Sequence, residues 1–258
     1  NLGKYKNEIN SLPQDIYTSV AGATYLTKEG GAANLFYGYK FEGVYSTQVE
    51  ANTSGLAILD ETGTRIPFSA GDAKFIDKNN DKVIDANDRY VIGNPNPDFY
   101  GGINNSFSYK NWRLGALFTF SVGNDVYNYT RAVLESGDNI YNQTFALANR
   151  WKADGQETTI PKVSYGDPMG NARFSDRWIE DGSYLRLRQL SIEYQFNVNK
   201  NIIKYVRLYG TANNLFTFNK YLGYDPEFSM SSNIFNQGID ATLEPQFRSF
   251  QLGLRIGL

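Results

Sequence analysis

Cysteine and histidine are both absent from this chain of 258 residues. Without cysteine, the chain has no disulfide framework, no thiol nucleophile and no cysteine-ligated zinc. Without histidine, it lacks the commonest general base and metal ligand, which excludes the classical hydrolase triads. The sequence assembles no nucleophile with a base, and its many carboxylate pairs do not nominate a glycosidase, because their separation is not known from sequence. We therefore predict that the chain is not an enzyme.

Strong net charge and long apolar runs are missing as well. The formal net charge is −2, so the chain offers no basic surface to nucleic acid. No run reaches the roughly 18 apolar residues that a membrane-spanning helix needs. The mean hydropathy of −0.46 is that of a water-soluble protein. Membrane strands escape this test, however, because they present only alternate residues to lipid.

A two-residue alternation is the main pattern that the chain does contain. Residues 249–258 (SFQLGLRIGL) alternate without a break between apolar and small or polar side chains. The length suits a tilted membrane strand, which needs about 9–11 residues to cross the hydrocarbon. A strand of a soluble β-sandwich shows the same pattern, so this segment alone leaves both interpretations open.

The alternation recurs in four earlier segments, at residues 103–109, 112–121, 185–196 and 205–216. In one of them the apolar residues change parity, because Leu185 and Leu187 are odd whereas Leu190 and Ile192 are even. Either a β-bulge near Arg188 or emergence of the strand from the lipid explains this change. Aromatic residues stand near the strand ends, as an interfacial girdle requires, although aromatics are common in any β protein.

The connections alternate between short and long, which is typical of outer-membrane barrels with tight periplasmic turns and long extracellular loops. The short ones are residues 110–111 and 197–204, and the long ones are 122–184 and 217–247. This pattern predicts a periplasmic C-terminus, a strand end at residues 4–10 and one large extracellular loop region at residues 11–100.

The fold class predicted from these patterns is all-β, a transmembrane antiparallel β-barrel with about six strands and long extracellular loops. Six strands do not close, since the smallest membrane barrels use about eight and an open edge leaves backbone groups unpaired in lipid. The chain also begins at Asn1 without an initiator methionine. We therefore expect residues 1–258 to be a mature or partial chain that forms one part of a larger barrel.

Several motifs resemble the C-terminal third of SusC/RagA-type TonB-dependent transporters, and they occur in the same order as in that family. They are GDAKFIDKNNDKVIDANDR at residues 71–89, VIGNPNPDF at 91–99, FYGYK at 36–40, RWIEDGSYLRL at 177–187, NNLFT at 213–217 and YDPE at 224–227. The resemblance implies that the chain supplies the C-terminal six or so strands of a barrel of about 22 strands with an N-terminal plug. The plug domain, the TonB box and the N-terminal strands are absent from this sequence.

The resemblance also implies a function. Such proteins import nutrient oligomers, either glycans or oligopeptides, across the outer membrane of Gram-negative bacteria. A SusD-like lipoprotein covers the extracellular mouth, and the TonB complex drives uptake through the plug. The patterns alone leave a second class open, a surface β-protein with a purely binding or adhesive function.

One loop has the spacing of a calcium site. Side-chain oxygens at positions 1, 3, 5, 9 and 12, with a backbone carbonyl at position 7, follow the EF-hand order of ligands. Lys82 replaces the usual turn glycine, Asp88 replaces the usual glutamate, and no helices are predicted on either side. The loop is therefore either a weak extracellular calcium site or an acidic turn that caps its own backbone. The candidate ligands within residues 77–88 are Asp77, Asn79, Asp81, Val83, Asp85 and Asp88.

Polar residues on the predicted membrane strands are candidates for the barrel lumen. They either line a substrate path or form salt bridges that brace the wall. Two short helices are predicted in the loop at residues 122–184, near 131–135 and 142–151. Loop aromatics there either stack on substrate or pack within the loop. The candidate lumen-facing residues are Arg113, Glu193, Arg207, Gln251 and Arg255.

Overall fold

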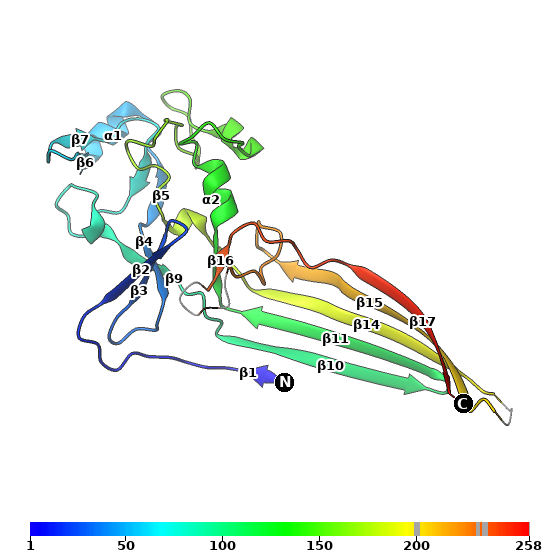
Figure 1. The fold of residues 1–258 in the computed structure, drawn as a ribbon. Coiled ribbons are helices and arrows are strands. Elements are labelled where there is room, and N and C mark those ends of the chain that lie inside the picture. Colours follow the sequence, from blue (N-terminus) through cyan, green and yellow to red (C-terminus); the bar gives the residue numbers. More distant parts are fainter. Residues whose placement is uncertain (199–201, 231–232, 234–236, 258) are drawn as a thin grey trace.

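The computed structural model describes residues 1–198, 202–230, 233 and 237–257. A sheet of long strands extends away from a lobe of shorter elements (Figure 1). The lobe is formed by the three long connections of the chain, residues 4–98, 123–183 and 220–248. The turn at residues 110–111 lies at the opposite end of the sheet, as does the end of the C-terminal strand, where Gly257 pairs with Tyr205.

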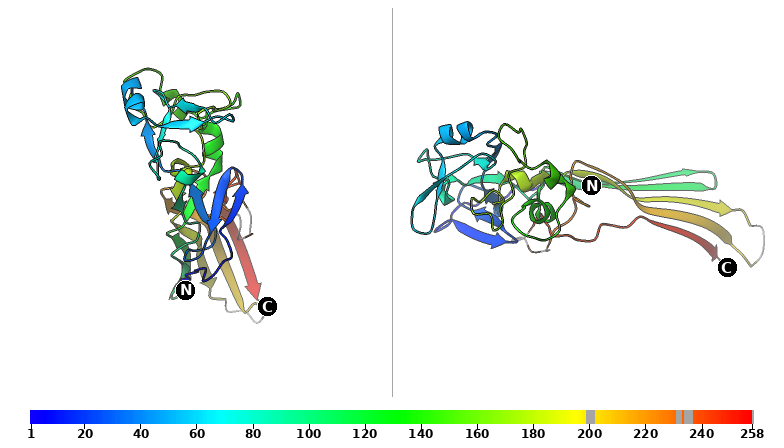
Figure 2. Two further views of the ribbon diagram at one scale, coloured as in Figure 1. Left: turned by 90° about the vertical axis from the view of Figure 1, so that its left-hand side faces the viewer. Right: turned by 90° about the horizontal axis from the view of Figure 1, so that it is seen from above.

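The long sheet has six strands in the order β1-β10-β11-β14-β15-β17, and all neighbours are antiparallel. The four alternating segments and the C-terminal one all form strands of this sheet, which confirms the predicted all-β class. Viewed from above, the strands curve along their length (Figure 2). The strands are β1 (Leu2–Gly3), β10 (Phe99–Tyr109), β11 (Trp112–Val122), β14 (Tyr184–Phe196), β15 (Tyr205–Asn219) and β17 (Ser249–Gly257).

The predicted strand end at residues 4–10 was wrong, because the chain leaves the long sheet after Gly3. Other partners take the polar groups of this segment. The Tyr5 hydroxyl donates to Asn96 Oδ1 at 2.8 Å, and the Ile9 N–H donates to the Gly31 carbonyl at 2.9 Å. Contacts with the lobe therefore replace the ladder that alternation alone would predict.

Short strands build most of the lobe. One sheet has the order β2 (Ile16–Val20), β3 (Ala23–Thr27), β4 (Leu35–Gly38) and β9 (Tyr90–Gly93). A second has the order β13 (Ile179–Asp181), β12 (Asp125–Asn128) and β16 (Ile239–Asp240). Two further pairs are β5 (Phe41–Val44) with β8 (Ala73–Phe75), and β6 (Ala57–Leu59) with β7 (Arg65–Pro67).

The helices of the lobe are short, and side-chain caps define their beginnings. Thr47 accepts the Glu50 N–H at the start of α1 (Gln48–Ser54), and Asn128 accepts the Arg131 N–H at the start of α2 (Tyr129–Glu135). α2 confirms the helix predicted near residues 131–135, whereas residues 142–151 contain only a 3₁₀ turn. No helix in the described part of the chain is long and apolar enough to span a membrane. The 3₁₀ turns are η1 (Ala86–Asp88), η2 (Phe145–Asn149) and η3 (Asp176–Trp178).

All three long connections contribute to one core of the lobe. Tyr25 and Phe36 come from the first connection, Tyr127 and Trp178 from the second, and Ile239 from the third. Each of these side chains is at most 4% exposed. Residues 11–100 therefore share a core with the later connections and do not bury all their apolar surface among themselves.

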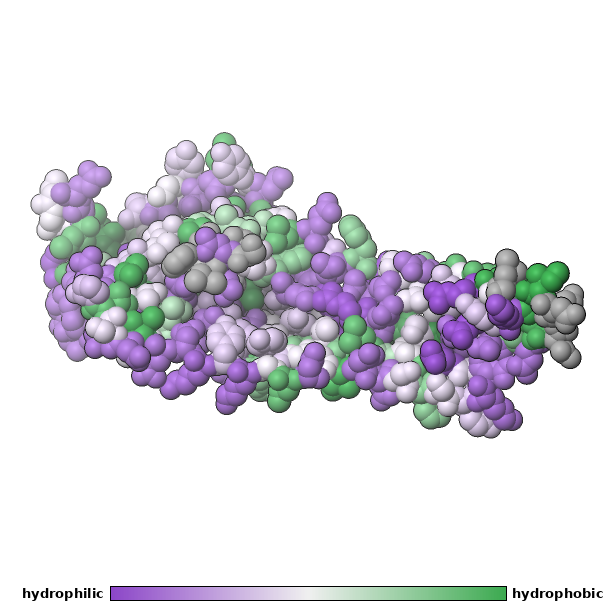
Figure 3. Space-filling model, turned by 60° about the horizontal axis from the view of Figure 1, so that its bottom comes forward, coloured by the Kyte–Doolittle hydropathy of each residue, from purple (hydrophilic) through white to green (hydrophobic). Residues whose placement is uncertain are grey.

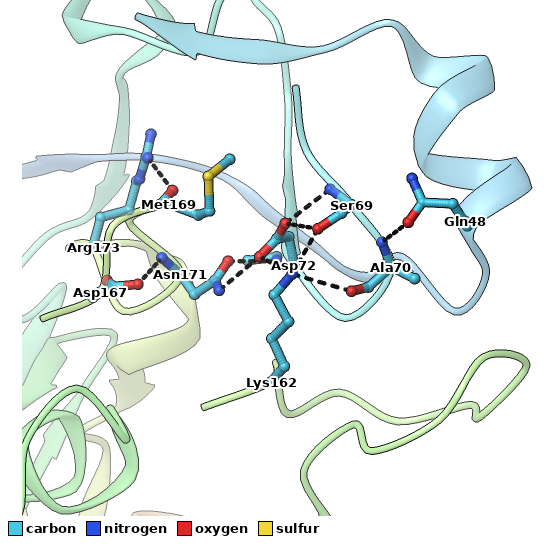
Figure 4. A network of polar contacts seen from close by, with 10 residues as sticks. Gln48, Ser69, Ala70, Asp72, Lys162, Asp167, Met169, Asn171 and Arg173 are labelled. Carbon is cyan, nitrogen blue, oxygen red and sulfur yellow. Dashed lines mark hydrogen bonds and ion pairs between the residues drawn. The ribbon is translucent and has the colours of Figure 1, made fainter. Parts of the chain in front are cut away.

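A buried carboxylate also joins the first connection to the second (Figure 4). Asp72 is fully buried. Its carboxylate accepts one hydrogen bond from the Ser69 N–H at 2.8 Å and another from Asn171 Nδ2 at 3.0 Å. Lys162 Nζ lies 3.1 Å from the same carboxylate. Asn171 in turn donates its N–H to Asp167, whose pKa is raised by burial. This network fixes two segments that are far apart in sequence.

Candidate functional site

The long sheet has one apolar face, and strand pairing aligns its members. Leu254 pairs with Leu208, which pairs with Tyr194, which in turn pairs with Trp112 at the short-turn end. The apolar side chains of this face are largely exposed, Leu252 for example by 80%. Side chains this apolar require a non-aqueous neighbour, and lipid is the neighbour that the strand lengths suit.

Aromatic residues gather at both ends of the apolar face. At the short-turn end, the Trp112 ring lies 4.7 Å from that of Tyr194, which lies 4.9 Å from that of Phe196. At the lobe end, Phe216 and Phe218 are 55% and 65% exposed. The rings therefore occupy the positions of the predicted interfacial girdle.

The five predicted lumen-facing residues share the opposite, polar face. Arg113 pairs with Glu193, Arg207 pairs with Arg255, and Gln251 pairs with Thr211 in the same parity. Arg207 Nη1 lies 3.5 Å from Glu193 Oε1, which is a long and partly exposed ion pair. The side chains of Arg113, Gln251 and Arg255 are exposed. The structure places these residues on one face, and their exposure to a lumen stays a prediction.

This polar face is hollowed at the short-turn end. A small cavity of about 190 Å³ is lined by Asn111, Arg113, Glu193, Gln195 and Arg207 among others. Arg207 Nε donates to Gln195 Oε1 at 3.1 Å, which orients its guanidinium along the wall. Arginines outnumber carboxylates in this lining, so the cavity favours an anionic group.

A β-bulge explains the change of parity within β14. Leu117 pairs with Gln189, but the next residue, Phe118, pairs with Leu187, so Arg188 is an extra residue. The bulge returns Leu187 to the apolar face, and emergence of the strand from the lipid is not needed to explain the pattern. It also turns Arg186 from the apolar face to the polar face.

Beyond the bulge, Arg186 forms a buried cluster of ion pairs. Its side chain is 2% exposed, and it bonds to Asp225 Oδ1 at 2.5 Å and to Glu227 Oε2 at 2.7 Å. Its Nε donates to Thr217 Oγ1 at 2.9 Å. Arg188, 29% exposed, lies 2.5 Å from the second Glu227 oxygen. The cluster joins the lobe end of the sheet to the third long connection.

A larger cavity of about 860 Å³ opens beside this cluster, at the lobe end of the polar face. Tyr100, Ser121 and Tyr184 contribute to it from the sheet, whereas Pro226 and Phe228 come from the third connection. Its lining is rich in aromatic and proline side chains. Such a surface suits the stacking of sugar rings or of apolar amino-acid side chains.

The acidic loop at residues 77–88 binds its own backbone. Asp77 accepts the Lys82 N–H at 3.0 Å, and Asp88 accepts the Lys78 N–H at 2.8 Å. Lys82 has φ 67°, the left-handed conformation that glycine usually supplies at this position of an EF-hand loop. The sharp turn therefore forms without glycine.

The other side-chain candidates also accept nearby amides, although Asp77 Oδ1 is buried without a hydrogen-bond partner. Asn79 accepts the Asp81 N–H, Asp81 accepts the Val83 N–H, and Asp85 accepts the Asn87 N–H. Nowhere in the described ranges do three acidic side chains come close enough together to hold a metal ion. This geometry matches the self-capped acidic turn, and calcium binding stays a prediction.

We expect calcium at about millimolar concentration to slow amide hydrogen exchange in residues 77–88, if the loop closes around the ion. The Asp81→Asn variant should lose this effect, because it removes a charged ligand. Asp60→Asn, in an exposed turn of the same lobe, is the control and should leave it unchanged. Hydrogen exchange by mass spectrometry, with magnesium in parallel, is the measurement. Identical exchange with and without calcium would exclude the site.

Comparison with known proteins identifies the chain. The TonB-dependent receptor P3 of Formosa agariphila is 34% identical over an alignment 273 residues long, which covers 99% of the chain. The TonB-dependent receptor SusC of Bacteroides thetaiotaomicron is 30% identical over 241 residues, which cover 89% of it. A solved structure of the RagAB peptide transporter matches 94% of the chain with a TM-score of 0.64 and 25% identity. No protein-family profile matches.

The chain belongs to the SusC/RagA-type TonB-dependent transporters. This SusC/RagA-type segment spans about a quarter of the proteins it matches, namely 26% of receptor P3, 20% of SusC and 24% of the matched RagAB chain. It is the C-terminal part of a transmembrane β-barrel of the outer membrane. Its relatives are named as receptors and transporters.

Sequence reasoning missed the main polar cluster of this SusC/RagA-type segment. Arg186 and Asp225 both lie within motifs that carry the resemblance, but nothing in their local spacing pairs them. The available signal was the parity change at Arg188, because a bulge there moves Arg186 to the polar face. The carboxylates that meet it come from a distant connection, which alternation does not address.

Proposed function

We propose that the complete protein imports nutrient oligomers across the outer membrane by TonB-dependent transport. This segment would supply one part of the barrel wall and three long extracellular connections. The observation that carries the proposal is the long sheet, with an apolar face sized for lipid and a polar face hollowed by a cavity of about 860 Å³. A wall of this kind separates lipid from an aqueous path.

The substrate class we propose is a glycan or an oligopeptide. The RagAB transporter is named as a peptide transporter, and this substrate is a property of that protein. In this chain the aromatic lining of the larger cavity suits stacking on either class. The lumen below this cavity would be lined by the five predicted lumen-facing residues, Arg113, Glu193, Arg207, Gln251 and Arg255.

Growth tests the transport proposal. A host that lacks the complete gene should grow poorly on oligomers too large for porins, either a malto-oligosaccharide mixture or a tryptic casein digest. The gene should restore growth on one of them, and deletion of TonB should remove the benefit. Growth on glucose and free amino acids is the control. If the gene restored growth on neither mixture, the import proposal would fail.

We further propose that a SusD-like lipoprotein docks on the lobe. Hydrophilic residues cover most of the lobe surface that is visible in Figure 3. The second long connection nevertheless exposes several large apolar side chains, which water alone does not favour. Ile140 is 86% exposed, Tyr141 is 74% exposed and Phe145 is 87% exposed. Exposed aromatic groups of this kind serve as anchors in protein interfaces.

We expect the triple variant Ile140→Ser, Tyr141→Ser and Phe145→Ser to weaken co-purification of the lipoprotein at least tenfold, since hot-spot anchors carry about 2 kcal/mol or more each. Barrel insertion should be unchanged, because no membrane strand is altered. Val49→Ser is the matched control, with an apolar side chain 74% exposed elsewhere on the lobe. Pull-down from solubilised outer membranes is the measurement. Undiminished co-purification would place the lipoprotein contact elsewhere.

A further inference from the structure

Arg186 pairs with Thr119 and Thr217 through the backbone ladder, but its side chain is a buried cation that takes no part in this pairing. Its side chain is 2% exposed, although it projects from a strand whose neighbours Leu185 and Leu187 face the apolar side. A buried guanidinium is strongly disfavoured unless its donors are paired. Here all three of its nitrogens have oxygen partners, on Thr217, Asp225 and Glu227. The bulge at Arg188 is what brings the side chain to this face.

The two carboxylate partners of Arg186 come from one short stretch, residues 221–230, called here the wall segment. Asp225 is 3% exposed, and its Oδ1 also accepts the Glu227 N–H at 3.0 Å. Glu227 uses its other oxygen for Arg188. Arg186 and Arg188 are two residues apart on β14, and the carboxylates that they bind, Asp225 and Glu227, are also two residues apart. Pro226 lies between the two carboxylates and restricts the backbone there.

Other bonds fix the start and the end of the wall segment. The Tyr221 hydroxyl donates to Asp240 Oδ2 at 2.6 Å in a buried site, and the Leu222 N–H donates to Glu180 Oε2 at 2.8 Å. At the other end, the Met230 N–H donates to the Ile239 carbonyl at 2.7 Å. The middle of the segment is attached to β14 by two arginines, of which Arg186 contacts both Asp225 and Glu227, whereas Arg188 contacts Glu227.

The wall segment forms one side of the larger cavity. Pro226, Glu227 and Phe228 line it, together with Tyr100 and Ser121 of the sheet. Tyr184 completes the lining from β14, two residues before Arg186. Loss of the Arg186 bonds would free Asp225 and loosen this side, which the Arg188–Glu227 pair alone would then hold to β14, while the strands stay paired.

We propose that Arg186 is a positioning residue that holds residues 221–230 as one wall of the solute cavity. The role assigned to the cavity rests on the proposed import function, whereas the position of the wall does not. Arg186 contacts the wall and not the solute. A single guanidinium that pairs two carboxylates fixes both the distance and the angle of the wall, which a lysine does not do.

A spin label tests the position of the wall in the complete protein, held in outer-membrane vesicles. Tyr224 is 74% exposed, so Tyr224→Cys accepts a nitroxide without disturbing the core, and any cysteine elsewhere in the complete protein is first replaced by serine. The label should be immobile in the parent and clearly more mobile with Arg186→Gln or Asp225→Asn. Arg186→Lys should restore part of the immobility. Lys220→Gln is the control, since Lys220 is an exposed cation on the same connection.

The cavity gives an independent readout. A bulky maleimide should modify Ser121→Cys several-fold faster when Arg186 is glutamine, because one wall has moved. For a solute that the parent imports, Arg186→Gln should raise the concentration for half-maximal uptake several-fold and leave the maximal rate nearly unchanged. A merely structural defect would lower the maximal rate through loss of inserted barrel.

The outcomes separate the two proposals. Unchanged label mobility with both Arg186→Gln and Asp225→Asn would overturn the positioning role. If Arg186→Gln fails to insert, Asp225→Asn decides, because it leaves Arg186 paired with Glu227. If the parent imports neither test mixture, the import proposal fails while the label still reports on the wall.

Discussion

Arginine in place of Leu254 is expected to abolish assembly of the barrel, whereas arginine in place of Gln251 is expected to be tolerated. Leu254 pairs with Leu208 on the apolar face, and its side chain is 59% exposed there. A charge on the lipid face costs about 2–4 kcal/mol near the middle of the bilayer and less towards its edges, and Leu254 lies inside β17 between Leu252 and Ile256 of the same apolar row. Gln251 pairs with Thr211 on the polar face, where Arg207 and Arg255 already lie.

The two variants form a matched pair, because both change one residue of β17 to the same side chain. Outer-membrane fractionation with heat-modifiable gel mobility measures assembly. Cysteine at the same two positions gives a second test, since a charged thiol reagent should modify position 251 and not position 254. Equal tolerance of both arginines would contradict the assignment of the two faces.

The long strands were predictable because each face meets a different environment over the whole length of the strand. Alternation in residues 249–258 and 112–121 specifies which side chains share a face, and a one-residue slip would reverse every one of them. The bulge at Arg188 was visible as a change of parity, although its cause stayed open until the pairing of Leu187 with Phe118 was known.

The lobe was not predictable in the same way. Strands such as β12 and β16 are only 4 and 2 residues long, too short to show a period. Their parallel pairing joins Tyr127 to Ile239, and no local pattern specifies a contact so distant in sequence. At residues 4–10 the sequence predicted the end of a long strand that the structure does not contain. These residues bond to the lobe instead of to a neighbouring strand. The candidate ligands in the acidic loop were predicted from spacing alone. Spacing does not reveal that each of the five side-chain candidates already accepts a backbone amide through one oxygen.

Removal of the Asp72 carboxylate is expected to destabilise the lobe by about 3 kcal/mol, because deletion of one partner leaves buried polar groups unpaired. Asp72 is fully buried, and Asn171 Nδ2 and the Ser69 N–H would lose their acceptor. The Lys162 side chain is 26% exposed, so its ammonium group can become hydrated when Asp72 is removed. The expected loss of stability is therefore near the lower end of the range of about 3–5 kcal/mol for breaking a buried ion pair.

The first and second long connections should therefore separate in the Asp72→Ala variant while the barrel remains assembled. Hydrogen exchange at Ala73, whose N–H donates to Asn171 Oδ1 at 2.8 Å, reports the loss directly. About 3 kcal/mol corresponds to an exchange rate roughly a hundredfold faster, if exchange follows opening of the lobe. Glu61→Ala is the control, because Glu61 is an exposed acid of the same lobe. Unchanged exchange at Ala73 in Asp72→Ala would show that the apolar core alone holds the two connections together, and that the buried network contributes specificity of arrangement without stability.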